Sequence, residues 1–69
     1  MVTATAEQIQ ELISLRGWTS ADADAEIARA CFVHPRSIER WRRNGCKREA
    51  AAKRILAMLE TARRKEGAA

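Results

Sequence analysis

Gly17, Pro35 and Gly45 divide the sequence into four segments, and this division is the strongest constraint on its fold. The segments carry apolar residues at the three- and four-residue spacing of amphipathic helices, and no alternating run is long enough to indicate a strand. Glycine tolerates the left-handed backbone at a helix end, and proline is favoured in a first helical turn. The sequence therefore predicts a single compact all-α domain of four helices over residues 1–69.

The helix boundaries follow from capping residues. Thr5 and Gln8 have the capping-box spacing, Thr19 or Ser20 can cap a second helix, and Pro35 opens a third. A fourth helix is expected at about 47–64, with fraying at 65–69. Its apolar stripe consists of Ala52, Ile55, Leu56 and Leu59. Two i,i+4 pairs of favourable orientation, Glu49-Lys53 and Glu60-Arg64, support the same helix.

Small side chains limit the hydrophobic core. Alanine accounts for 14 of the 32 apolar residues, which leaves 18 larger ones, including Cys31 and Cys46. A core of this size stabilises a short chain by only about 3–5 kcal/mol, and such domains often gain support from a disulfide, a metal or a partner chain. We expect Cys31 to be buried and Cys46 to be exposed. Ala51 and Met58, outside the stripe of the fourth helix, favour a homodimer.

Several classes of function are excluded. One histidine, no paired-carboxylate pocket, no phosphate loop and no Ser–His constellation argue against an enzyme. Cys31, His34 and Cys46 fit no standard zinc spacing, and we expect no cofactor or small-molecule ligand. The sequence has no signal peptide and no membrane span, which predicts a cytoplasmic chain associated with the nucleoid.

The charge is unevenly distributed. The net charge is +4, but residues 1–33 carry −3 and residues 34–69 carry +7. A basic half of this kind indicates either a polyanionic partner or a solvated helix surface.

The segment Asp24–Arg43, DAEIARACFVHPRSIERWRR, resembles a helix-turn-helix of the lambda-repressor and Cro type. Ala28 is the small residue where two helices cross, and Phe32-Val33-His34 is the turn. The apolar inner positions of the motif are Ile27, Cys31, Val33, Ile38 and Trp41. The family most often has glycine where this chain has Phe32, so either Phe32 accepts strain or the turn has another geometry.

The resemblance implies a sequence-specific double-stranded DNA-binding regulator. We expect a phage or mobile-element repressor that binds an inverted repeat as a homodimer, with recognition helices about 34–36 Å apart. Its size resembles Cro-like proteins and the small autoregulators that accompany anti-CRISPR genes. An excisionase-like or architectural DNA binder is an alternative, although a helical segment after Cys46 leaves no room for a β-wing. A protein-binding adaptor that reuses the fold is another.

The third helix presents its arginines on one side. At 100° per residue, Arg36, Arg40 and Arg43 fall within an arc of roughly 60°, opposite Ile38 and Trp41. Arginine can pair with guanine O6 and N7 or bind phosphates.

Further candidate DNA contacts have alternative structural roles. Ser37 can reach a base edge or a phosphate, and His34 can contact a phosphate or cap the turn. Glu39 can accept a hydrogen bond from cytosine or pair with Arg43. We expect contacts with the phosphate backbone of DNA from Arg42, Arg43, Lys47 and Arg48. Trp41 and Trp18 are expected to be structural.

Overall fold

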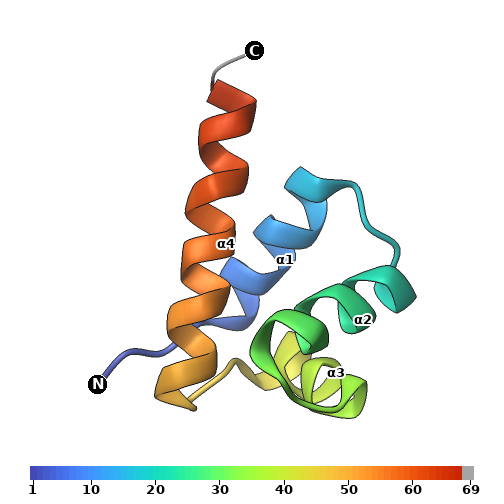
Figure 1. Cartoon of the computed structure of the whole chain (residues 1–69), viewed down its shortest axis with the longest axis vertical. Helices are drawn as coiled ribbons and strands as arrows, with labels where there is room; N and C mark the ends of the chain where they lie inside the picture. The colour runs from blue at the N-terminus through green and yellow to red at the C-terminus, as the bar shows by residue number, and fades with distance from the viewer. Residues whose placement is uncertain (68–69) are drawn as a thin grey trace.

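The computed structural model of the chain describes residues 1–67 and contains four α-helices joined by short connections (Figure 1). They are α1, Ala6–Arg16; α2, Ser20–Cys31; α3, Pro35–Asn44; and α4, Glu49–Gly67. Over this range there is no strand, only an isolated β-bridge between Ala4 and Cys46. The predicted all-α domain of four helices is confirmed. No helix in residues 1–67 is both long enough and apolar enough to span a bilayer.

The capping residues begin the first two helices as predicted. The Thr5 hydroxyl accepts a hydrogen bond from the Gln8 N–H at 3.1 Å, and the Gln8 side chain accepts one from the Thr5 N–H at 2.9 Å. These two bonds form the predicted capping box. Thr19, rather than Ser20, caps α2 by accepting from the Asp22 N–H at 3.1 Å.

The N-terminal segment pairs with the connection that leads into α4. Ala4 and Cys46 exchange two backbone hydrogen bonds, at 2.9 and 2.7 Å. Gly45 allows this approach, because its φ is +83° and a Cβ there would lie only 3.0 Å from the Ala4 carbonyl oxygen. Cys46 is held in this bridge, and α4 begins at Glu49, two residues after the predicted start at Lys47.

The same bridge corrects one prediction about burial. Cys46 is fully buried beneath the N-terminal segment, so the expectation that it is exposed is wrong. At its other end α4 continues past the predicted limit at Arg64, and residues 65–67 are helical rather than frayed. The rest of the segment expected to fray, 68–69, lies outside the described residues.

The helices pack as two pairs around one core. In Figure 1, α1 crosses α4, while α2 and α3 lie side by side at the lower end of the molecule. The large aliphatic side chains that are fully buried are Ile9, Leu12, Ile27, Ile38, Ile55 and Leu59. Six alanines complete the buried set with Cys31 and Cys46, which confirms a core built largely from small residues.

Several side chains depart from the predicted core. Ala51 is buried within the domain, so it offers no surface to a partner, whereas Met58 is half-buried. Leu56, expected in the buried stripe of α4, is also half-buried. Trp18 and Trp41 pack against the core without being enclosed by it, which agrees with their predicted structural roles.

Candidate nucleic-acid interface

The connection between α2 and α3 is a tight turn built on Phe32. This residue has φ +57° and ψ +45°, the left-handed conformation that glycine adopts without steric cost. The N–H groups of Phe32 and Val33 both donate to the carbonyl of Ala28, which closes the end of α2. Of the two outcomes left open by the sequence, the turn keeps its left-handed residue and Phe32 accepts the strain.

The Phe32 side chain contributes little to the core. It is 81% exposed, and the guanidinium of Arg54 on α4 lies 5.0 Å from its ring centroid. A cation–π contact at an exposed site contributes about 0.5–1 kcal/mol. This contact ties the turn to α4.

His34 and Pro35 begin α3. The Nδ1 atom of His34 accepts a hydrogen bond from the Arg36 N–H at 3.1 Å, so His34 is the N-cap, one of the two roles expected for it. Pro35 occupies the first turn, where its missing N–H leaves no unpaired donor. The His34 side chain is exposed at this end of α3.

One side of α3 is buried and the other is basic. Ile38 is fully buried and Trp41 is half-buried, whereas Arg36, Arg40 and Arg43 are exposed. We call these three arginines the Arg face. They line a single shallow depression of about 300 Å³ together with Glu39 and Asn44. The structure therefore places them on one surface, as the helical periodicity predicts.

Glu39 lies within the Arg face and is paired only loosely. Its Oε1 is 3.8 Å from Nη2 of Arg43, and the two side chains are 53% and 77% exposed. An exposed i,i+4 pair of this kind is worth a few tenths of a kcal/mol. Both groups are therefore free to exchange this contact for one with a ligand.

Asn44 is a candidate that the sequence reasoning missed. Asn44 is the last residue of α3, and it lines the same depression as the Arg face. An amide can pair with adenine N6 and N7, so the residue type itself was an available indication.

Arg42 serves a different purpose from the other arginines of α3. Its Nε and Nη2 donate to the two carboxylate oxygens of Asp24 on α2, at 2.8 and 3.1 Å. Only 19% of the Arg42 side chain and 17% of the Asp24 side chain are exposed. The hydrogen bond to Asp24 raises the pKa of Arg42, and the two-point contact directs its guanidinium toward α2.

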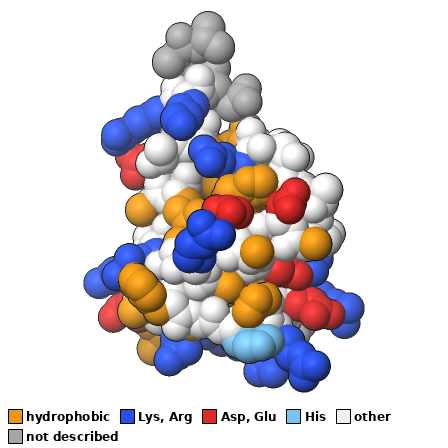
Figure 2. Space-filling model, turned by 45° about the vertical axis from the view of Figure 1, so that its right-hand side comes forward, with side chains coloured by type: hydrophobic (Ala, Val, Ile, Leu, Met, Phe, Trp, Pro, Cys, Tyr) orange, Lys and Arg blue, Asp and Glu red, His pale blue; other side chains and the backbone are white. Residues whose placement is uncertain are grey.

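The remaining candidates lie outside the depression. Ser37 is half-buried on α3, while Lys47 and Arg48 are exposed in the connection to α4. Figure 2 shows basic side chains on both sides of the histidine at the lower end of the molecule, the end where Figure 1 places α3. The structure thus gathers the Arg face, but it leaves Lys47 and Arg48 on a separate segment.

The cysteines belong to the packing of the domain. The Cys31 thiol donates to the Ala51 carbonyl at 3.7 Å, and burial raises the pKa of this thiol. Cys46 lies 3.6 Å from the Arg48 carbonyl oxygen. Among the side chains of residues 1–65, no three His, Cys, Asp or Glu are placed to share a metal ion.

Comparison with known proteins adds no identification: no protein-family model, curated protein or solved structure matches the chain.

Proposed function

We propose that the chain is a sequence-specific regulator of the helix-turn-helix class that binds double-stranded DNA through α3. The observation that carries the proposal is the division of α3, with Ile38 buried on one side and the Arg face exposed on the other. A helix that enters the major groove needs an apolar side that packs against its own domain and polar side chains that contact the bases. More specifically, we propose that the chain is a repressor that binds an inverted repeat as a homodimer.

The side chains of α3 have different roles in the proposed recognition of DNA. Arg36 and Arg40 pair with guanine edges, and Asn44 pairs with adenine. Arg43 binds a phosphate and gives up its weak contact with Glu39 when it does so. His34, Ser37 and Lys47 add phosphate contacts at the two ends of the helix.

Two features hold α3, the proposed recognition helix, in place within the domain. Arg42 is bound to Asp24, which joins α3 to α2 through two hydrogen bonds. The Phe32 turn fixes the chain between the same two helices. A helix held in this way loses little conformational freedom when it binds.

Selection of bound duplexes from a random DNA pool tests the proposal. We expect a palindromic consensus, and we expect affinity to fall steeply as salt rises, because bound phosphates release their counterions. A pool without sequence enrichment but with salt-sensitive binding would support an architectural DNA binder instead. Absence of any salt-sensitive DNA binding would overturn the proposal and favour an adaptor whose Arg face meets an acidic protein.

An excisionase-like protein with a β-wing receives no support. Such a wing follows the recognition helix, whereas α3 here leads into α4 through a connection that carries only the Ala4–Cys46 bridge.

A further inference from the structure

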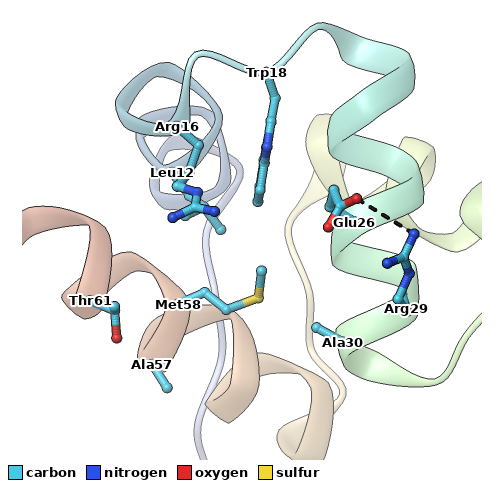
Figure 3. Close-up of a pocket in the computed structure, with 9 residues that line it drawn as sticks. All are labelled: Leu12, Arg16, Trp18, Glu26, Arg29, Ala30, Ala57, Met58 and Thr61. Carbon is cyan, nitrogen blue, oxygen red and sulfur yellow. Dashed lines mark ion pairs between the residues drawn. The ribbon is translucent and has the colours of Figure 1, made fainter. Parts of the chain in front are cut away.

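A second surface feature lies away from the Arg face. It is a groove of about 560 Å³ between α1, α2 and α4, and no residue of α3 lines it. Its apolar lining consists of Leu12, Trp18, Ala30, Ala57 and Met58. Figure 3 shows the Trp18 ring extending into the space between α1 and α2, with the Met58 side chain reaching toward it from α4.

The groove holds large apolar side chains that the isolated domain does not enclose. Trp18 and Met58 are both half-buried, while the fully buried set contains neither a tryptophan nor a methionine. Aromatic and thioether side chains gain most from leaving water, and a chain of this size has few other sources of stability. The groove is therefore where a partner would add most to the core.

The rim of the groove carries both signs of charge. The Arg16 guanidinium lies 5.2 Å from the centroid of the Trp18 ring, and no carboxylate of the described residues forms an ion pair with it. Glu26 is 43% exposed and makes one 3.6 Å contact with Arg29. The groove is thus lined by Arg16 from α1 and by Glu26 and Arg29 from α2, so a second copy related by a two-fold axis can place its Glu26 against Arg16. A purely acidic or purely basic partner would leave one of these charges opposed by a like charge.

The α4 wall of the groove is shaped for close approach. Ala57 and Thr61 are small, and both are exposed beside Met58. A helix with small side chains at this point can lie closely against another helix.

We propose that this groove is the homodimer interface, and that its occupant is a second copy of the chain. In a two-fold arrangement, α4 of each copy lies along the groove of the other, and Arg16 of one copy faces Glu26 of its partner. Because α3 does not line the groove, both Arg faces remain free. This inference rests on the proposed function for the existence of a dimer, and it adds the surface that forms it.

Sedimentation equilibrium of the full chain without DNA is the first test. Ala57→Arg places a long charged side chain in the groove at an exposed helical position, so the fold should survive. The matched control is Ala50→Arg, an exposed alanine of α4 that does not line the groove. We expect a wild-type dimer, a dimer dissociation constant raised at least about tenfold by Ala57→Arg, and no change with Ala50→Arg. Circular dichroism must show equal helix content in all three.

Charge reversal is the second test. Arg16→Glu and Glu26→Arg should each weaken the dimer, and the double variant should recover most of the loss. A monomeric wild type, equal effects of Ala57→Arg and Ala50→Arg, or a double variant weaker than both single variants would each overturn the interface.

Failure of this interface can be told apart from failure of the proposed function. A duplex with one half-site should bind Ala57→Arg as tightly as wild type, because the Arg face is unchanged. If the wild type selects a DNA sequence but the two tests above fail, DNA recognition stands and only the dimer surface is wrong.

Discussion

Arg42 of α3 binds both carboxylate oxygens of Asp24 on α2, and this pair fixes the two helices relative to each other. Each partner is largely enclosed, so removing one leaves the other with an unsatisfied charge. We expect Asp24→Ala to lower the free energy of unfolding by about 1–3 kcal/mol, measured by urea denaturation. Glu60→Ala is the control, because its i,i+4 pair with Arg64 is exposed, lies outside the proposed dimer groove and should contribute under about 0.5 kcal/mol. Equal effects of the two substitutions would contradict a special role for Asp24.

Phe32 offers a test of stored strain. A left-handed backbone costs a residue with a Cβ about 1–2 kcal/mol, and the contact with Arg54 returns about 0.5–1 kcal/mol. We expect Phe32→Gly to raise the free energy of unfolding by about 0.5–1 kcal/mol, because it removes the larger of these terms. Phe32→Ala keeps the strain and loses the contact, so it should be destabilising. Thermal and urea unfolding of both variants will show whether they move in opposite directions.

Arg40 lies between the other two residues of the Arg face in sequence and is central to the proposed recognition. Arg40→Ala should weaken binding to the selected operator by about 1–3 kcal/mol and relax specificity at one base pair, as measured by fluorescence anisotropy. Arg64→Ala is the matched control, because Arg64 pairs with Glu60 on α4 at 2.7 Å, away from α3. Unchanged operator affinity of Arg40→Ala, with normal helix content, would remove α3 from the interface.

Substitution of Glu39 distinguishes repulsion of DNA phosphates by this carboxylate from recognition of a base by it. Its contact with Arg43 is long and exposed, so we expect Glu39→Gln chiefly to remove repulsion from DNA phosphates. Affinity should then rise by about 1 kcal/mol or less on operator and unrelated duplexes alike. A loss confined to operators with cytosine at one position would instead assign Glu39 to base recognition.

Glu11 links stability to pH. The hydrogen bond from Arg63, 2.8 Å from Nη2 to Oε1, lowers the pKa of this carboxyl. The folded state therefore holds the charged form more strongly than the unfolded state does. This stabilisation is fully present above the ordinary pKa of glutamate, about 4.3, and is lost as the pH falls through the lowered value. Urea unfolding across this range should show a shallower acid loss for Glu11→Gln, and Arg63→Gln should produce the same change.

Local patterns were sufficient to predict most helix boundaries. The capping box at Thr5, the cap at Thr19 and the helix starts and stops at Pro35 and Gly45 act between neighbours in sequence, so their effect can be predicted without tertiary contacts. The common side of Arg36, Arg40 and Arg43 follows from helical periodicity alone.

Contacts between distant segments could not be predicted in this way. The Ala4–Cys46 bridge buries a cysteine that was expected to be exposed. The Asp24–Arg42 pair joins α3 to α2 through an arginine that the sequence offered only as a candidate DNA contact. Both depend on which elements meet in space.

The sequence by itself determined the number of helices, the caps of α1, α2 and α3, and the basic side of α3, because these depend on backbone conformation and on the 3.6-residue repeat. The tertiary structure alone decided which arginine is held within the protein, that Phe32 occupies a strained turn, and that Trp18 and Met58 line an open groove. The physical reason is that burial and ion pairing depend on three-dimensional proximity, which helix packing creates between residues far apart in the chain.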